Sequence, residues 1–371
     1  MAQSARDIKV FVHLGHGFGA RSWRRRHALG LIPGLNDHLA YGYYRAGGDG
    51  WSIEYSEDKV ENSLRKLWRL TLRKLLGFDL IHAWRNRKCL LAADMVWTHT
   101  ELDGLAALAL YVIRPWHSRP KIIANCVWLF DRWNSLSKPR RAVYRKLLEH
   151  ADVVTTFSPS NLKVAENVLP GVRCEYIAWG AATGELKRYE GGTVHRPLRI
   201  VSLGSDIHRD WETLARAFGN DERYAVRIGT GRLDRRMIIG LDNISLLNPR
   251  TADDIKRLYE WADVVVVSLK ANLHASGITV ILEAVILGVP VVCTDSEGLR
   301  AYFSPAEVRY VPPRAPVAMR RAAEELATDD KLRAGMVARA QNRLSVAELT
   351  SQGFADRLRR LSGSLLLRDC P

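Results

Sequence analysis

The stretch VVVVSLKANLHASGITVILEAVILGVPVVC, residues Val264–Cys293, decides the fold. It begins with four valines, and this β-branched run predicts a strand buried on both faces of a sheet. A loop follows, and a helix is predicted from about Ile278 to Gly288, a residue type that commonly ends helices. Pro290 then opens a second short apolar strand. Strand, helix and strand in this order indicate an α/β domain with a parallel sheet.

Two polar features of this stretch indicate a nucleotide. The helix begins after Ser276 and Gly277, and its free N–H groups and partial positive charge suit a phosphate. Glu283 stands among apolar residues of the helix, where a carboxylate is costly unless it is hydrogen-bonded. The vicinal diol of a ribose would offer it two donors. The alternative is a structural Glu283, bonded to backbone or to an arginine.

The same stretch resembles the C-terminal signature of GT-B glycosyltransferases, particularly the large retaining family 4, glycosyl transferases group 1. That signature has a Glu, seven residues, a second Glu and a Gly-x-Pro-Val-Val close. Glu283 matches the second Glu, which binds the nucleotide ribose in the family, and Gly277 matches the glycine whose neighbouring amides face the donor. The first Glu is replaced by Ala275, between His274 and Ser276, so the usual contact to the donor sugar is missing.

A length of 371 residues predicts two domains. The resemblance is strongest over 150–300, and it implies an α/β, GT-B fold in which two Rossmann-like domains with parallel sheets face a deep cleft. We expect an N-terminal acceptor domain with a basic surface over 1–185, a linker over 186–197 and a nucleotide-sugar domain over 198–345. A C-terminal helix over 346–371 is expected to cross back to the first domain.

The net charge of +15 is concentrated in the first half of the chain, where residues 1–185 hold 27 Lys and Arg against 17 Asp and Glu. Such a field favours an anionic membrane, a nucleic acid or a polyanionic acceptor. No nucleic-acid motif or aromatic-basic repeat is present, so nucleic acid is not an expected partner.

A basic amphipathic helix is predicted over 60–76. One interpretation packs its apolar face on the sheet of the first domain, and the other lays that face on a membrane surface. Its apolar face comprises Leu64, Leu67, Trp68, Leu72 and Leu75.

The cysteines are scattered without metal-ligand spacing, which predicts a reduced, cytoplasmic chain. The N-terminus does not resemble a signal peptide, and no apolar run approaches the ~20 residues of a membrane span. We therefore expect a cytoplasmic protein attached peripherally to the inner face of the cell membrane. The cysteines are Cys89, Cys126, Cys174, Cys293 and Cys370.

A glycine-rich loop follows the first predicted strand, Ile8–Leu14, and the resemblance implies that it lines the acceptor side of the cleft. A glycine loop alone is weak evidence for dinucleotide binding, and a plain turn is the alternative. His38–Tyr44 and Trp51–Tyr55 are predicted as short strands. The predicted acceptor or cleft residues are Gly15, His16, Gly17, Phe18 and Arg21.

Three residues near predicted strand ends are candidates for catalysis, because catalytic groups of open α/β sheets gather there. His99 matches a family histidine near the donor sugar, and Glu101 follows at the same strand end. Asp131 is the candidate general base if the reaction inverts the anomeric centre. Ordinary structural roles are the alternative for each of them.

The second domain is expected to hold the donor through a Gly-Arg and a Lys that grip the diphosphate in the family. Arg209 takes the position of the Lys, Ser205 stands where the Arg would be, and a surface ion pair is the alternative for Arg209. The predicted donor-binding residues are Gly204, Ser205, His208, Arg209, Leu247, Asn248, His274, Ser276, Gly277, Ile278, Thr279 and Glu283.

The resulting prediction is a glycosyltransferase of the hexosyltransferase type that moves a sugar from a UDP-sugar to a lipid-linked or saccharide acceptor in bacterial-type surface polysaccharide assembly. The reaction is expected to be retaining, with no cofactor and no metal, since there is no Asp-x-Asp motif. The alternatives are an inverting transferase with Asp131 as base, a GT-B sugar-nucleotide epimerase that uses His274, and a catalytically dead scaffold.

Overall fold

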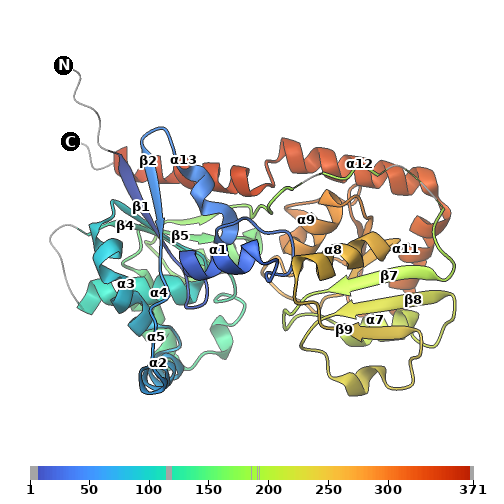
Figure 1. The fold of residues 1–371 in the computed structure, drawn as a ribbon, viewed down its shortest axis with the longest axis horizontal. Helices are drawn as coiled ribbons and strands as arrows, with labels where there is room; N and C mark the ends of the chain where they lie inside the picture. The colour runs from blue at the N-terminus through green and yellow to red at the C-terminus, as the bar shows by residue number, and fades with distance from the viewer. Residues whose placement is uncertain (1–6, 114–118, 185, 190, 192, 368–371) are drawn as a thin grey trace. The chain divides into compact units, whose positions relative to one another are not determined.

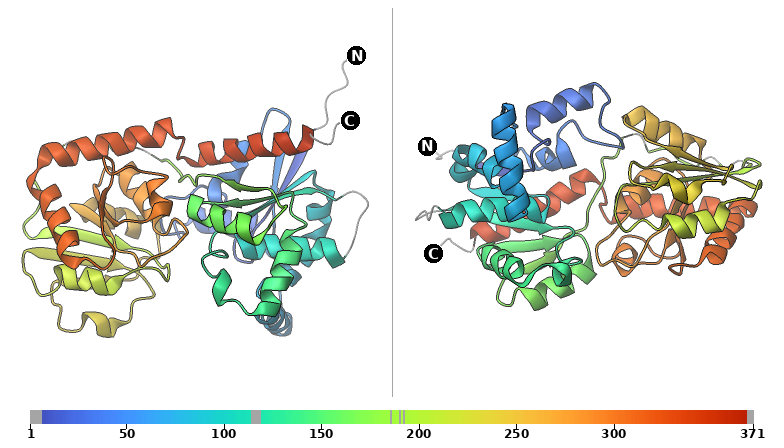
Figure 2. Two further views of the ribbon diagram at one scale, coloured as in Figure 1. Left: turned by 180° about the vertical axis from the view of Figure 1, so that it is seen from behind. Right: turned by 90° about the horizontal axis from the view of Figure 1, so that it is seen from below.

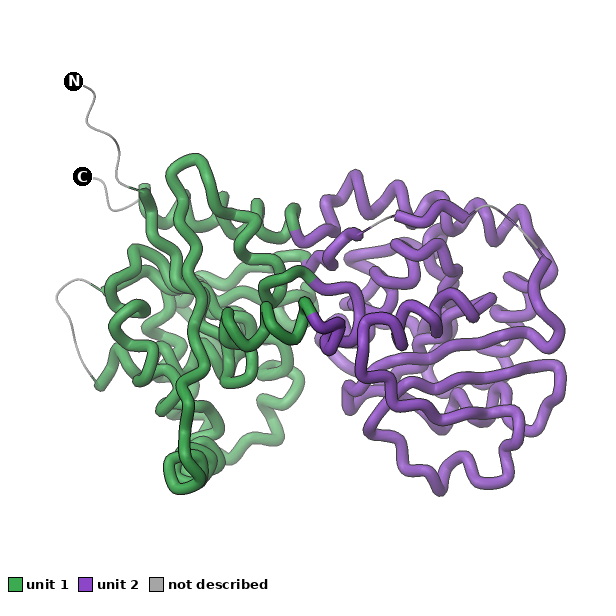
Figure 3. Tube along the Cα trace, in the orientation of Figure 1, with its two compact units in different colours: residues 1–28, 37–178, 352–371 green, residues 29–36, 179–351 purple. Residues whose placement is uncertain are grey.

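The computed structural model describes residues 7–113, 119–184, 186–189, 191 and 193–367. These residues form two compact units, each built on a six-stranded sheet whose neighbouring strands all run parallel (Figure 1). Unit 1 comprises residues 1–28, 37–178 and 352–371, and unit 2 comprises residues 29–36 and 179–351 (Figure 3). Parts of the expected linker, at 190 and 192, and Cys370 lie outside the described residues.

The sheet of unit 1 has the strand order β2-β1-β3-β4-β5-β6, with helices on both of its faces (Figure 2). All four residues of β3 are buried, as a strand covered on both faces requires. The elements are β1 Ile8–His13, α1 Ala20–Ala28, the 3₁₀ helix η1 Ala40–Ala46, β2 Trp51–Tyr55, α2 Ser63–Leu76, α3 Leu80–Ala92, β3 Met95–Thr98, α4 Glu101–Ile113, β4 Lys121–Cys126, η2 Trp133–Ser135, α5 Lys138–Leu148, β5 Val153–Thr156, α6 Pro159–Val168, β6 Cys174–Tyr176 and α13 Ser351–Leu366.

The C-terminal helix α13 packs within unit 1, together with the N-terminal strands. The indole N–H of Trp97 on β3 donates a hydrogen bond to Oγ of Ser362 at 2.9 Å. The ring of Phe354 packs edge-on against Tyr43, with 5.4 Å between the ring centroids. The last helix is therefore part of the core that holds the first sheet.

The predicted strand at 38–44 is wrong, whereas the one at 51–55 is confirmed as β2. Residues 40–46 form the 3₁₀ helix η1, which is kinked at Tyr41 and Gly42, where the φ angles are 62° and 71°. Positive φ angles at two successive residues reverse the chain and prevent the extended backbone of a strand. The backbone N–H of Tyr44 donates a hydrogen bond to the hydroxyl oxygen of Tyr55 at 2.8 Å, where the N–H of a strand residue would donate to the carbonyl of a neighbouring strand.

Helix α2 presents its apolar face outward, which excludes the interpretation that this face packs on the sheet. The residue that α2 buries is Arg69, with 4% of its side chain exposed; its guanidinium bonds Asp79 at 2.6 Å and Glu61 at 2.8 Å. Among the helices of the described ranges, none combines the length and the apolarity needed to traverse a bilayer. The outward apolar residues include Leu64 (77% exposed), Leu67 (64%), Trp68 (62%) and Leu75 (72%).

The sheet of unit 2 has the strand order β12-β11-β10-β7-β8-β9, and the stretch Val264–Cys293 contributes β10 and most of β11 to it. The four valines of β10 are fully buried, as their β-branched run predicts. The elements are β7 Leu198–Leu203, α7 Trp211–Phe218, β8 Tyr224–Gly229, η3 Arg235–Ile238, β9 Ile244–Leu247, α8 Ala252–Trp261, β10 Val264–Val267, α9 Ile278–Ile286, β11 Val291–Thr294, α10 Glu297–Arg300, β12 Arg309–Val311, α11 Pro316–Thr328 and α12 Asp330–Val346.

Candidate functional site

The first candidate site lies in unit 2, where the loop after β10 leads into helix α9. Gly277 caps this helix with a left-handed φ of 86°, and no side chain caps the helix N-terminus. A Cβ at Gly277 would lie 2.6 Å from Cγ1 of Val267, which is too close for any larger residue. The close passage of the loop over β10 therefore requires glycine, and the N-terminal end of α9 has no side-chain cap in the described structure.

Arg209 places a buried positive charge beside this helix end. Its side chain is 3% exposed, and Nε and Nη1 have no hydrogen-bond partner among the residues that the structure describes. Nη1 lies 3.1 Å from the position that a Cβ of Gly277 would take. Burial lowers the pKa of Arg209, because the desolvated guanidinium loses its hydration. A buried cation with unused donors is costly, and an anion would compensate it.

The hydroxyl of Ser276 adds a second unused polar group at the same end of α9. Its Oγ is buried without a hydrogen-bond partner in the described part of the chain. A helix N-terminus, a guanidinium and a hydroxyl together match the several oxygens of a phosphate or diphosphate. This group contains three of the predicted donor-binding residues.

The two predicted donor-side histidines are held by one carboxylate, Asp206. His274 is 3% exposed, and its Nε2 lies 3.0 Å from Oδ2 of Asp206. Nδ1 of His208 lies 3.1 Å from the other oxygen, and the backbone N–H of His208 donates to that oxygen at 2.7 Å. Burial alone would raise the pKa of Asp206, but the hydrogen bonds from His274 and His208 hold it well below its usual range. Asp206 therefore orients both rings.

Glu283 is buried, and both of its carboxylate oxygens already accept a hydrogen bond. Oε1 accepts from the backbone N–H of Leu35 at 2.8 Å, and Oε2 accepts from the hydroxyl of Tyr259 at 2.8 Å. Burial raises the pKa of Glu283, although both bonds oppose that shift. A carboxylate offers about four lone-pair sites, so each oxygen keeps one for a ligand hydroxyl. The predicted contact to ribose stays a prediction. The bond from the backbone of Leu35 is of the kind that the structural alternative describes, whereas the hydroxyl of Tyr259 is a partner that the sequence did not indicate.

The remaining predicted donor residues differ in their surroundings. Ser205 and Thr279 are exposed, so neither is committed to the core. The carbonyl oxygen of Leu247 accepts from the backbone N–H of Thr230 at 3.0 Å, and Oδ1 of Asn248 lies beside Gly231. Part of the backbone expected to read the base is therefore used by the scaffold.

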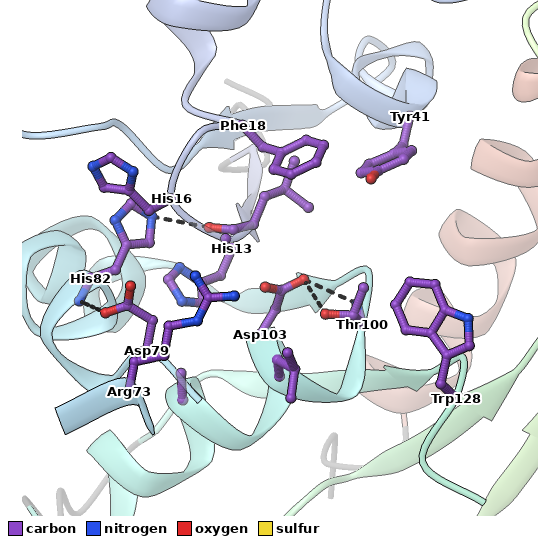
Figure 4. Close-up of a pocket in the computed structure, with 14 residues that line it drawn as sticks. His13, His16, Phe18, Tyr41, Arg73, Asp79, His82, Thr100, Asp103 and Trp128 are labelled. Atoms are coloured by element: carbon purple, nitrogen blue, oxygen red, sulfur yellow. Dashed lines mark hydrogen bonds between the residues drawn. The ribbon is translucent and has the colours of Figure 1, made fainter. Parts of the chain in front are cut away.

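A second candidate site is a cavity of about 210 Å³ within unit 1. It lies beyond the end of β1, between the loop after β1 and helices α3 and α4 (Figure 4). Of the five residues predicted on the acceptor side, three line this cavity. The lining residues are His13, Leu14, Gly15, His16, Phe18, Tyr41, Arg73, Asp79, His82, Thr100, Leu102, Asp103, Ala106 and Trp128.

The other two predicted acceptor residues are engaged elsewhere. The backbone N–H of Gly17 donates to Oδ1 of Asp58 at 2.9 Å, which fixes the turn of the glycine loop. The side chain of Arg21 is 84% exposed and pairs with Glu57 at 3.3 Å. Arg21 is therefore a surface residue and not part of the cavity wall.

Asp103 is one of two carboxylates that line the cavity, with Asp79, and Figure 4 shows it between the histidines and Trp128. Its Oδ2 accepts hydrogen bonds from the backbone N–H of Thr100 at 3.0 Å and from the hydroxyl of Thr100 at 2.9 Å. Burial raises the pKa of Asp103 to about 7, although these bonds oppose the shift. In the sequence, Asp103 follows the same predicted strand end as Glu101, where catalytic groups of open α/β sheets gather, and its Thr-x-x-Asp spacing indicates a helix cap.

The three residues predicted to be catalytic do not line this cavity. His99 lies against the ring of Tyr41, with 3.5 Å between the centroids, and burial lowers its pKa to about 3. Oε2 of Glu101 accepts from the backbone N–H groups of Val127 and Trp128 at 3.0 and 3.2 Å, so this carboxylate holds the loop after β4. Asp131 is half-buried in that same loop.

Residues 239–343 match the family model described as Glycosyl transferases group 1. This match confirms the resemblance found in Val264–Cys293, and with it the class of enzyme, a glycosyltransferase. No curated protein matches the chain.

Solved structures resemble the chain over almost its whole length. A sucrose-phosphate synthase from Thermosynechococcus elongatus has a TM-score of 0.71 at 15% identity, covering 98% of this chain and 100% of that one. HepE from Anabaena, in complex with UDP and glucose, has a TM-score of 0.68 at 13% identity, covering 97% and 100%. A glycosyltransferase from Rickettsia africae has a TM-score of 0.58 at 13% identity, covering 98% and 99%. With the two parallel sheets, these likenesses confirm the predicted α/β, GT-B fold.

Proposed function

We propose that this glycosyltransferase takes a hexosyl group from a UDP-sugar held by unit 2 and transfers it to a saccharide acceptor carried on a lipid. The observation that carries the donor half is Arg209, a buried guanidinium with unused donors at the uncapped N-terminus of α9. The structurally similar HepE is known in complex with UDP and with UDP-glucose, which supports UDP as the nucleotide.

The proposed roles follow from the charge that the reaction creates. When the bond from the anomeric carbon to the β-phosphate oxygen breaks, the electron pair leaves with UDP. An acceptor hydroxyl oxygen bonds to that carbon, and the proton of this hydroxyl passes to the departing phosphate oxygen. Arg209, the hydroxyl of Ser276 and the N-terminus of α9 would stabilise the departing diphosphate. Glu283 would use its remaining lone pairs for the ribose hydroxyls. The positive charge of these groups would compensate the diphosphate, as a metal ion does in other transferases. For the stereochemistry, we propose that the anomeric configuration is retained.

Helix α2 supports the lipid-linked acceptor. Its apolar side chains are exposed beside basic ones, and one of its residues, Arg73, lines the cavity of unit 1. A helix that turns apolar side chains outward between arginines and lysines suits the interface of an anionic membrane. We therefore propose peripheral attachment at the inner face of the cell membrane, as in surface polysaccharide assembly.

A nucleotide screen tests the donor half. The melting temperature of the purified protein is measured with UDP, GDP, ADP and CMP, each from micromolar to millimolar concentration. UDP is expected to raise the melting temperature in a saturable way, and UDP-sugars are then tested for transfer to lipid extracts. No shift with any of the four nucleotides would overturn the proposal.

A sugar-nucleotide epimerase is the second candidate, and the pair of the buried His274 with the half-buried Asp206 favours it. A histidine oriented by a carboxylate is a common acid or base. Turnover of the UDP-sugar to its epimer without any acceptor would support this function, whereas strict dependence on an acceptor would exclude it.

A further inference from the structure

Residues 29–36 form a strap on unit 2, although they lie in sequence between two segments of unit 1 (Figure 3). The carbonyl oxygen of Gly30 accepts a hydrogen bond at 2.9 Å from the backbone N–H of Ala252, the first residue of α8. The side-chain amide of Asn36 donates to the carbonyl oxygen of Pro33 at 2.9 Å. The strap is therefore anchored to α8 at its beginning, and one of its own side chains closes the turn at its tip.

The tip of the strap lies directly on the carboxylate of Glu283. The backbone N–H of Leu35 donates to Oε1 at 2.8 Å, and a Cβ at Gly34 would collide with the same oxygen. Gly34 also has a left-handed φ of 94°, so both the backbone conformation and the space beside Glu283 require glycine. Any side chain at residue 34 would displace the carboxylate from its present position.

The strap and Tyr259 each hold one oxygen of this carboxylate. The hydroxyl of Tyr259 donates to Oε2 at 2.8 Å, while Leu35 donates to Oε1, so a rotation of the carboxylate would break both bonds. The bond from Leu35 also opposes the rise that burial causes in the pKa of Glu283, and it thereby favours the ionised form, in which both oxygens accept. A pair of acceptors that is already fixed loses less conformational entropy when a diol binds.

We infer that the strap is a positioning element of the donor site: through Gly34 and Leu35 it sets the carboxylate of Glu283 for a vicinal diol, and it makes the site selective for ribonucleotides. The inference rests on the proposed function and deepens it, because it assigns recognition of the ribose in part to a segment from the N-terminal half of the chain. The strap residues are not expected to contact the diphosphate, which Arg209 and the N-terminus of α9 would hold.

A comparison of UDP with 2′,3′-dideoxy-UDP on the full protein tests this inference, because the two nucleotides differ only in the diol. Isothermal titration calorimetry measures both dissociation constants. The wild type is expected to bind UDP at least tenfold more tightly, as hydrogen bonds to a charged group imply. In Gly34→Ala this ratio is expected to fall below threefold, while the dissociation constant of the dideoxy nucleotide changes by less than twofold.

Gly48→Ala is the matched control for the strain of placing alanine at a left-handed position. Gly48 has a φ of 93° in an exposed turn of unit 1, and a Cβ there would meet nothing within 4 Å. This variant should keep the wild-type ratio. A folded Gly34→Ala that also keeps the ratio, or that loses both nucleotides equally, would overturn the inference. Tighter binding of UDP by Gly34→Ala would overturn it as well, because the strap would then obstruct the site.

Hydrogen exchange at the Leu35 amide of the wild type, measured by NMR, covers the case in which Gly34→Ala does not fold. Exchange is expected to slow at least fivefold with saturating UDP and less than twofold with the saturating dideoxy nucleotide, and equal protection by the two would overturn the inference. If the wild type binds both nucleotides with the same affinity, this inference fails and the proposal for the diphosphate stands. If it binds neither, the donor proposal itself has failed.

Discussion

Replacing Arg209 by methionine is expected to stabilise the empty protein and to abolish its response to UDP. Methionine keeps an unbranched, flexible side chain that fills the same passage beside Gly277. The guanidinium it replaces is 3% exposed, and two of its nitrogens have no partner among the described residues. The protein therefore carries a desolvation cost that only a bound anion repays, and the two effects of the substitution have opposite signs.

The magnitudes follow from the same geometry. Removing a buried charge in favour of an apolar side chain stabilises a domain by ~1–4 kcal/mol, and in a domain of this size each kcal/mol raises the melting temperature by about 2–4 °C. A hydrogen bond to a charged group contributes ~1.5–3 kcal/mol. Losing two such hydrogen bonds would weaken the binding of UDP by roughly two to four orders of magnitude. Wild-type protein with UDP at 100 times its Kd gains ~2.7 kcal/mol, and the variant gains almost nothing.

Differential scanning calorimetry of both proteins, with and without UDP, measures this reversal. The variant is expected to melt above the wild type without nucleotide, and UDP is expected to narrow or invert the difference. Arg216→Met is the matched control, because the side chain of Arg216 is 70% exposed on α7. This substitution should change neither the melting temperature without nucleotide nor its shift with UDP. An Arg209→Met protein that melts lower than the wild type and keeps the full UDP shift would refute the reasoning.

Three further predictions concern other parts of the molecule. Glu283→Ala leaves the backbone N–H of Leu35 without its acceptor, whereas the Tyr259 hydroxyl can still donate to the carbonyl oxygen of Val280 at 3.3 Å. We expect lost transfer, ~1–3 kcal/mol lower stability and faster hydrogen exchange at Leu35; unchanged exchange at Leu35 would contradict this prediction. The raised pKa of Asp103, about 7 against an ordinary 3.8, means that native protein binds this proton more tightly than unfolded protein. Wild-type stability should therefore fall as pH rises from about 4 through 7. Over that pH range the free energy of unfolding of Asp103→Asn, measured by urea titration, should rise by ~4 kcal/mol relative to that of the wild type. If the two proteins change in stability with pH in parallel, the carboxyl of Asp103 is not buried as described. Leu64→Ser with Trp68→Ser should abolish flotation with anionic liposomes at low salt without lowering the melting temperature; failure of the wild type to float would exclude α2 as a membrane contact.

The local pattern of the chain was enough to predict an α/β fold with parallel sheets, and the family resemblance of the same stretch predicted the class of enzyme. The valines of β10, the glycine before α9 and the apolar strand after Pro290 are neighbours in sequence, so their geometry follows from backbone preferences and short-range packing. The same holds for the helix with Glu283, whose buried position was expected from its apolar neighbours. A backbone partner was one of the alternatives, but the sequence could not predict which one, because Leu35 is 248 residues away along the chain.

Only the tertiary structure decided which face of α2 is exposed and which of two neighbouring carboxylates on α4 enters the cavity. Periodicity identifies the apolar face of α2, but only the buried ion pairs of Arg69 show that this face is turned outward. Glu101 and Asp103 both begin α4, and a helix rotates by about 200° over two residues. One carboxylate therefore holds the loop after β4 while the other enters the cavity. A sequence shows that both are acidic and close together, and the direction of each depends on what the rest of the fold places around the helix.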